Sequence, residues 1–262
     1  YKKGFLISIN HTKKTVYLNR LFYFCTMQVS RFKRNIVLSI LFFLPVSFLL
    51  FLYPAKHHYT PLDIVNNQPC NEFIGLKTLK GDVLRLEDHI TVVLFLGKSP
   101  MDYVTASSNL KELVYDKFKG FKKFQIVAIA SDESRAQIDT LKAELTQYES
   151  LKYWHFLTGS DFAIGNFFSY LNSDFALNDD LGSNHVYIID KELMQRGRLD
   201  DRSKQEKSKA SPSYPLYSYD CIEVADIKNK MSEDMRILFT EYRQKRKGNF
   251  DSNSRRASDL KK

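Results

Sequence analysis

The sequence predicts an α/β sandwich, in which a largely parallel β-sheet has helices on both faces. Continuous apolar runs of strand length occur at "ITVVLFL", "FQIVAIAS" and "HVYIID", which suits strands that are covered on both faces. The segments between them place apolar residues at helical spacing, so strands alternate with helices along the chain. This alternation implies βαβ units, whose strands run parallel and whose helices pack on the sheet.

The first elements follow in order after residue 70. "FIGLKTLKGDVLRLED" alternates on both sides of Lys80-Gly81-Asp82, which predicts a hairpin with a glycine turn. The buried strand "ITVVLFL" comes next, and from Ser107 onward "SSNLKELVYDKF" forms an amphipathic helix behind a Ser/Asn cap. The second buried strand, "FQIVAIAS", leads into a second amphipathic helix within "ESRAQIDTLKAELTQY".

The later elements continue the same alternation. "YWHFLTG" is a third, shorter strand, and Ser160-Asp161 opens a third helix in "SDFAIGNFFSYL". "HVYIID" is a fourth strand, and "QRGRL" begins its antiparallel neighbour. The acidic loop with Asp174, Asp179 and Asp180 lacks the ligand spacing of a calcium loop, so we interpret it as a solvated connection.

The C-terminal part separates into three segments by composition. Residues 200–214 are charged, Ser-rich and nearly free of large apolar side chains, which predicts a mobile surface insertion in a domain that spans 70–221. Residues 222–247 form a long amphipathic helix, which either docks on the domain or presents a surface to another protein. Residues 248–262 are basic and polar without a packing pattern, which predicts a disordered tail.

A membrane span precedes the domain. "NIVLSILFFLPVSFLLFLY", residues 35–53, has no charge and is long enough to cross the roughly 30 Å hydrocarbon layer as a helix. Because basic flanks stay in the cytoplasm, residues 1–34 are expected inside and everything after the span outside. A cleaved signal peptide is the alternative, but the run exceeds a typical h-region and "YPAKHHYT" lacks an A-x-A site. We therefore favour a retained single-pass anchor, followed by a linker over 54–69.

The segment before the anchor is unusual. Met27 makes a more ordinary start, so we expect that residues 1–26 belong to an upstream-extended reading frame and are not natively translated. Residues 1–34 carry eight basic and no acidic side chains, and the last twenty residues carry eight basic and two acidic ones. The net charge of +9 therefore leaves 35–242 at −5, and this folded part lacks the basic surface that nucleic-acid binding requires.

Three cysteines remain, and only Cys70 and Cys221 would share the exported side, because Cys25 precedes the span. An oxidising compartment permits a disulfide between them, provided that their Cα atoms come within about 7 Å. We favour two unpaired thiols, and the disulfide is the alternative. Neither cysteine lies in the connection after "ITVVLFL", where "GKSPMDYV" contains no sulfur nucleophile.

The element order, with "VAIASDESRAQIDTLKAEL" and "WHFLTGS" as its most specific phrases, resembles the Sco/SenC family of membrane-anchored thioredoxin-fold proteins over roughly residues 70–200. The resemblance implies a thioredoxin-like three-layer α/β/α sandwich. In that family, which is associated with copper delivery to cytochrome oxidase, this connection carries Cys-Pro-x-x-Cys, and a His before the last strand completes a copper site. Laid on that pattern, Ser99 and Tyr103 stand at the cysteine positions with Pro100 between them, and a frame shifted by one residue puts Pro100 and Val104 there instead. Neither frame supplies a thiol. His185 is the histidine candidate, although it lies closer to the strand than the pattern has it.

The missing sulfur decides the functional expectation. Dithiol exchange needs an attacking thiolate and a resolving thiol, and copper(I) selects thiolate or thioether ligands. We expect a pseudoenzyme without a cofactor: a bacterial inner-membrane protein with a cytoplasmic N-terminus and a periplasmic domain, which binds a protein partner as an assembly factor for a respiratory or envelope complex. The alternative is thiol-redox or copper chemistry in a non-standard site that uses Cys70, Cys221 or His185.

Overall fold

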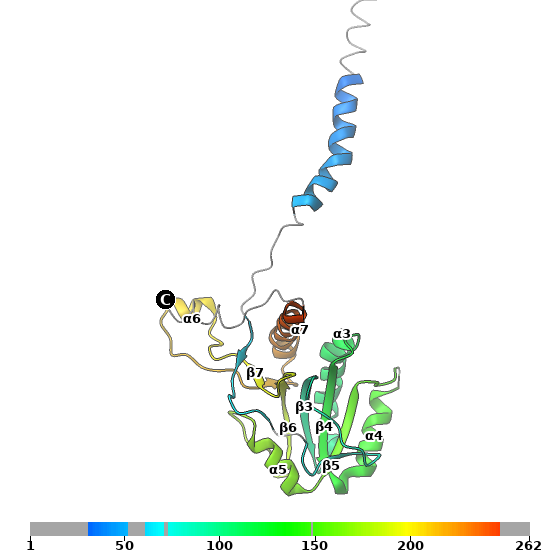
Figure 1. The fold of residues 1–262 in the computed structure, drawn as a ribbon, viewed down its shortest axis with the longest axis vertical. Helices are drawn as coiled ribbons and strands as arrows, with labels where there is room; N and C mark the ends of the chain where they lie inside the picture. The colour runs from blue at the N-terminus through cyan, green and yellow to red at the C-terminus, as the bar shows by residue number, and fades with distance from the viewer. Residues whose placement is uncertain (1–30, 52–60, 71–72, 148, 247–262) are drawn as a thin grey trace, which may run out of the picture. The chain divides into compact units, whose positions relative to one another are not determined.

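The computed structural model describes residues 31–51, 61–70, 73–147 and 149–246 (Figure 1). The chain forms two compact units, Tyr1–His58 and Tyr59–Lys262. The described part of the first unit is one helix, Arg31–Phe51, which is long and apolar enough to cross a membrane. It begins ahead of the predicted span, and residues 52–53 lie outside the described residues, as do 1–30, 54–60 and 248–262 with the predictions made for them.

The second unit is built on an eight-stranded sheet with the order β1-β7-β6-β3-β4-β5-β2, and β8 pairs with β6. The strands are β1 Asp63–Ile64, β2 Lys77–Thr78, β3 Ile90–Gly97, β4 Phe124–Ser131, β5 Trp154–Gly159, β6 Gly182–Ile189, β7 Gln195–Gly197 and β8 Tyr219–Asp220. Strands β3, β4 and β5 run parallel, and β6 enters antiparallel to β3. The sheet is therefore mixed, with a parallel centre, rather than largely parallel.

Helices cover both faces of this sheet. They are η1 Pro100–Tyr103, α2 Val104–Leu110, η2 Lys111–Tyr115, α3 Asp116–Phe118, η3 Asp132–Ser134, α4 Arg135–Leu145, α5 Asp161–Ser169, α6 Lys204–Ser208, η4 Asp226–Met231 and α7 Ser232–Arg246. Buried side chains of α2, α4 and α7 pack in one core cluster, and those of α5 pack in another. The predicted thioredoxin-like α/β/α sandwich is confirmed (Figure 1).

Alternation along β3 separates the two core clusters. All eight residues of β3 are buried, with Val92 and Leu94 in the cluster beneath α4 and Val93 and Phe95 in the cluster beneath α5. Successive strand residues point to opposite sides of a sheet, so we call these sides the α4 face and the α5 face. The continuous apolar run in the sequence exists because both faces are covered.

Two sequence predictions at the start of the domain were wrong. The turn at Gly81 forms, with its N–H donating to the Thr78 carbonyl, but no second strand follows it, and β2 pairs with β5 instead of with a hairpin partner. Residues 61–69, predicted as linker, belong to the folded unit, because β1 pairs antiparallel with β7. A two-residue strand is too short to leave a periodic signal.

The predicted surface insertion over 200–214 contains a short helix. Ser203 caps α6 by accepting from the Glu206 N–H, while the Glu206 side chain accepts from the Ser203 N–H. Arg202 binds both carboxylate oxygens of Asp200 and donates to the Ser211 carbonyl. The low apolar content therefore predicted surface exposure correctly but gave no sign of this capped turn.

The C-terminal helix docks on the domain, which resolves the alternative that the sequence left open. Ile227, Met231, Met235 and Leu238 are fully buried in the α4-face cluster. The helix is α-helical only from Ser232, after the π-helical turn η4, and it ends at Arg246 within the described residues. Its apolar stripe therefore completes this core and is not a free surface.

One buried and one partly buried ion pair fix α7 to the sheet. Arg196 on β7 binds Glu241 at 3.0 Å and also donates to the Leu62 carbonyl at the start of the domain. Arg198 binds Asp234 through two nitrogens, and the Tyr219 hydroxyl donates to the same carboxylate at 2.7 Å.

Candidate functional site

The connection after β3 lies against the segment that leads into β6. Gly97 has φ +58, and a Cβ there would lie 2.0 Å from the Asp180 carbonyl oxygen, so only glycine fits this approach. The Lys98 N–H donates to that carbonyl at 2.7 Å, and the Ser134 hydroxyl donates to the Lys98 carbonyl at 2.8 Å. Two distant segments, at Asp180 and at Ser134, therefore hold the connection at the carboxyl end of the parallel strands.

Tyr103 stands at the second cysteine position of the family pattern. Its side chain packs against Asp180 and Gly182, where β6 begins. Its side chain is 5% exposed, and its ring lies over Gly182, where an added Cβ would come within 2.3 Å of the ring. Its hydroxyl donates to Asp180 Oδ1 at 3.0 Å and accepts from Asn178 at 2.9 Å. Asp180 Oδ1 also accepts from the Gly182 N–H at 3.1 Å. We call Tyr103, Asn178, Asp180 and Gly182 the tyrosine plug.

Ser99 and Pro100 complete the connection without supplying a nucleophile. Ser99 is half-buried and precedes η1, and its carbonyl accepts from the Asp102 N–H at 3.0 Å. Pro100 is buried at the first helical position, where its fixed φ suits the turn. A serine hydroxyl lacks the acidity for thiol-type exchange, so the connection cannot carry dithiol chemistry.

An ion pair bridges the outer side of the connection. Lys98 Nζ lies 2.6 Å from Asp161 Oδ2 at the start of α5, and both side chains are about half exposed. The hydrogen bond to Asp161 raises the pKa of Lys98 above its usual value. Beside this pair, Phe162 is 83% exposed, which places a large apolar side chain on the surface at this end of the sheet.

His185 and Met101 do not converge on a metal site. Val186 packs on the α4 face and Tyr187 on the α5 face, so alternation places His185 on the α5 face, whereas Met101 packs against the α4-face cluster. The His185 ring stacks on Phe175 with centroids 4.0 Å apart. Across the described residues, no group of three or more His, Cys, Asp or Glu side chains could hold a metal ion. The donors present therefore do not fit copper(I).

The half-buried His185 is expected to make folding sensitive to mild acid. Burial lowers its pKa, and the charges of Asp220 and Asp226 oppose that shift only in part. The unfolded chain then takes up the proton more readily, so His185 contributes stability that is present above pH ~6.5 and is lost as pH falls below that value. Urea unfolding at pH 7 and pH 5 should show a smaller difference for His185→Gln than for the wild type.

The Phe175→Ala variant is the matched control for this prediction. It removes the ring that covers the imidazole while it keeps the titrating group. NMR titration should then show the pKa of His185 moving back toward its usual value. An unchanged pKa would contradict burial as the cause.

The two cysteines lie on opposite faces of the sheet and are unpaired, as the sequence favoured, so the bridge that it permitted does not form. Cys70 packs in the α5-face cluster and its N–H donates to the Leu193 carbonyl at the β6–β7 turn. Cys221 packs in the α4-face cluster, and its carbonyl accepts from Asn109. Both are free and buried. Cys70 lies on the other face of the sheet from Tyr103. Asn109, which contacts Cys221, is six residues after Tyr103, about 9 Å along a helix axis. Neither cysteine therefore restores a thiol to the connection.

Native-state alkylation tests this description of the thiols. Burial raises the pKa of Cys70 to about 12, and burial followed by the charge of Asp220 raises that of Cys221 further. In a Cys25→Ser background, iodoacetamide at pH 8 should label neither thiol in the native chain and both in guanidinium, because only the thiolate reacts.

The isosteric variant Ser99→Cys provides a positive control in the same background. A thiol there is half-buried and lies at the start of a helical turn, so it should be alkylated in the native protein while Cys70 and Cys221 stay protected. Native labelling of either buried cysteine would show that the described packing is wrong.

Comparisons with known proteins give a likeness in fold. No family model matches the chain, and no curated protein matches it. Similar solved structures include a SCO1/SenC family lipoprotein from Bacillus anthracis (17% identity, 70% of this chain and 99% of that one, TM-score 0.42). A second is Bradyrhizobium japonicum ScoI with copper bound (14% identity, 62% of this chain and 95% of that one, TM-score 0.34). A third is the thioredoxin domain of a Bacteroides vulgatus thiol-disulfide oxidoreductase (14% identity, 51% of this chain and 86% of that one, TM-score 0.36).

The plug residues Asn178, Asp180 and Gly182 were missed as site residues by the sequence analysis. The structure brings Asp180 to Tyr103, which is 77 positions earlier in the chain, whereas the sequence showed only an acidic loop. The available signal was the glycine directly before a buried strand, because such a position often marks a close approach of another chain segment.

Proposed function

We propose that this chain is a membrane-anchored thioredoxin-fold pseudoenzyme that acts as a binding or assembly module without thiol or copper chemistry. The observation that carries the proposal is the tyrosine plug. A side chain that is buried, hydrogen-bonded twice and packed on a glycine occupies the position where a resolving thiol would act. The scaffold is preserved around a centre that cannot exchange disulfides.

The anchor supports a place at a membrane. Helix Arg31–Phe51 has the length and composition of a span, and Arg31, Lys33 and Arg34 lie in its first turn. The preference of basic flanks for the cytoplasm puts the thioredoxin-like unit on the outer side, which is the periplasm in a bacterial inner membrane. The resemblance to Sco/SenC proteins links that address with respiratory-complex or envelope biogenesis.

A redox assay and a copper titration test the proposed lack of thiol and copper chemistry. The full chain in detergent should not accelerate dithiothreitol-driven insulin reduction, and the double variant Cys70→Ala, Cys221→Ala should behave identically. Copper(I) titrated against a competing chelator should show no one-equivalent site, in the wild type or in His185→Gln. Catalysis lost in the double variant, or a copper site lost in His185→Gln, would overturn the proposal.

Photo-crosslinking tests the binding part. Phe162, 83% exposed beside the connection, can be replaced by p-benzoylphenylalanine without disturbing the core. The matched control is Phe121, which is 48% exposed and lies three residues before β4, at the opposite end of the parallel strands. We expect one protein in native membranes to crosslink at position 162 and not at 121. Equal crosslinking at both positions, or none at 162, would count against a partner at this end.

A further inference from the structure

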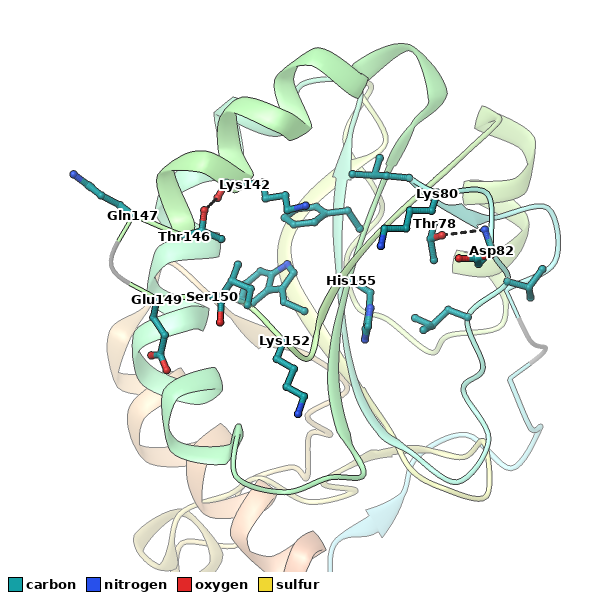
Figure 2. Close-up of a pocket in the computed structure, with 16 residues that line it drawn as sticks. Thr78, Lys80, Asp82, Lys142, Thr146, Gln147, Glu149, Ser150, Lys152 and His155 are labelled. Atoms are coloured by element: carbon teal, nitrogen blue, oxygen red, sulfur yellow. Dashed lines mark hydrogen bonds between the residues drawn. The ribbon is translucent and has the colours of Figure 1, made fainter.

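A hollow of about 890 Å³ lies beside the outer edge of β5, away from the tyrosine plug (Figure 2). Figure 2 shows Lys142 and Thr146 from the end of α4 on one side and Thr78 and Lys80 on the other, with His155 between them. The hollow is also lined by apolar side chains from both segments and from β5 itself: Leu79, Val83, Leu84, Leu151, Trp154 and Phe156. We call it the β5-edge hollow.

The hollow follows an open sheet edge. The inner side of β5 pairs with β4 from Trp154 to Gly159, but on the outer side β2 covers only Leu157 and Thr158. Within the part of the chain that the structure describes, no strand covers the outer edge at Trp154, His155 and Phe156. An edge of this kind presents main-chain donors and acceptors to an added strand.

The lining shows that the hollow runs along this edge and not over one face. Trp154 and Phe156 pack on the α4 face, so alternation puts His155 on the α5 face, yet all three residues line the hollow. An extended segment beside β5 would place alternate side chains on these two faces, as strand addition requires.

The polar groups of the lining favour an acidic occupant. Lys80, Lys142 and Lys152 have no acidic partner within ion-pair distance among the described residues. Of the two carboxylates in the lining, Glu149 is already paired with Lys119, which leaves Asp82. Positive charge therefore exceeds negative charge around the hollow.

A buried donor without an acceptor adds an independent observation. The indole Nε1 of Trp154 is buried and has no hydrogen-bond partner among the described residues, although the Trp154 side chain lines the hollow. Buried polar groups are normally satisfied, so this donor is an exception to that rule in a residue that lines the hollow.

We propose that the β5-edge hollow binds an extended acidic segment of a partner protein, which adds to the sheet beside Trp154, His155 and Phe156. Main-chain hydrogen bonds hold the segment at the open edge, and its carboxylates pair with the three lysines. The hollow is separate from the tyrosine plug. This proposal therefore does not depend on whether the end of the domain at the plug lacks thiol and copper chemistry.

The single tryptophan of the chain makes occupancy directly measurable. The full chain in detergent is titrated with fluorescein-labelled Glu-Val-Glu-Val-Glu, and peptide anisotropy and Trp154 fluorescence are recorded together. Both signals should saturate with the same dissociation constant. The double variant Lys142→Glu, Lys152→Glu should weaken binding about tenfold, because it reverses the charges that face the segment.

Three controls distinguish strand addition by an acidic segment from non-specific charge attraction and from simple anion binding. The double variant Lys204→Glu, Lys228→Glu makes the same change in net charge on exposed lysines outside the hollow and should leave the affinity unchanged. The peptides Lys-Val-Lys-Val-Lys and Glu-Pro-Glu-Pro-Glu should not bind, since the first has the wrong charge and the two prolines of the second lack N–H donors and disfavour pairing as a strand.

The proposal is overturned if neither signal changes, if the basic peptide binds equally well, or if the proline peptide does, which would indicate a simple anion site. Equal weakening in both double variants, or self-association of the chain through this edge, would also overturn it. None of these outcomes bears on the redox and copper tests of the tyrosine plug.

Discussion

The variant Arg196→Met should lower the free energy of unfolding by about 3–5 kcal/mol, because it leaves the buried Asp190 without a cation and Glu241 with only the partly exposed Lys245. The Arg196 side chain is 2% exposed and contacts Asp190, Glu241 and the Leu62 carbonyl. Burial alone would lower the pKa of Arg196, but Asp190 and Glu241 raise it, so the guanidinium stays charged in the fold. Methionine fills similar volume, so the expected loss is electrostatic and not a cavity effect.

This side chain holds three parts of the domain together. Leu62 lies directly before β1, Asp190 accepts from two N–H groups in the β6–β7 turn, and Glu241 lies on α7. Loss of the cation should therefore loosen the C-terminal helix before the sheet unfolds. Hydrogen exchange should show the largest loss of protection in α7 and around Leu62.

The exposed pair of Arg202 and Asp200 is the matched control. Arg202→Met removes the same charge from a bidentate contact on the surface, where it should change stability by less than about 1 kcal/mol. Urea unfolding followed by circular dichroism measures both variants. If Arg196→Met were no more destabilising than Arg202→Met, the buried contacts of Arg196 would not be the main interactions that hold α7 on the domain.

The elements that the sequence predicted correctly share one property, which is a long and regular pattern. The buried strands β3, β4 and β6 and the helices α4 and α7 each present enough apolar residues to define a period. The errors at 61–89 have the opposite cause. There, β1 and β2 have two residues each, and the alternating residues after Gly81 line the hollow beside β5 without forming a strand.

At the candidate site, too, the sequence predicted local features but not contacts between distant segments. Resemblance located Ser99, Pro100 and Tyr103, because these positions are defined by local order after a strong strand. The packing of Tyr103 on Gly182 could not be predicted, since it depends on how β6 pairs with β3. The separation of Cys70 from Cys221 likewise depends on which face each residue occupies, a property of sheet register that spacing in the sequence does not contain.

A double-mutant cycle on Tyr103 and Gly182 should give the second large effect and test the tyrosine plug directly. Tyr103→Ala removes a buried ring and should destabilise the fold by about 3–5 kcal/mol. Gly182→Ala adds a methyl group where the ring already lies, at a cost of about 1–3 kcal/mol. In the double variant the methyl group occupies space that the ring has left, so the combined loss should be smaller than the sum.

Two matched variants separate the contribution of the Tyr103 hydroxyl from that of its ring, and the crowding at Gly182 from the general effect of adding a methyl group to a glycine. Tyr103→Phe keeps the ring and removes the hydroxyl that joins Asn178 to Asp180, so it should cost about 1–2 kcal/mol. Gly165→Ala, in α5, adds a methyl group with no atom within 4 Å and should be neutral or stabilising by up to about 1 kcal/mol. Additive losses at Tyr103 and Gly182 would mean that the ring and the glycine do not share one space. The second cysteine position would then be open to a partner or a ligand, and the reason for regarding this end of the domain as chemically inert would rest on the absence of sulfur alone.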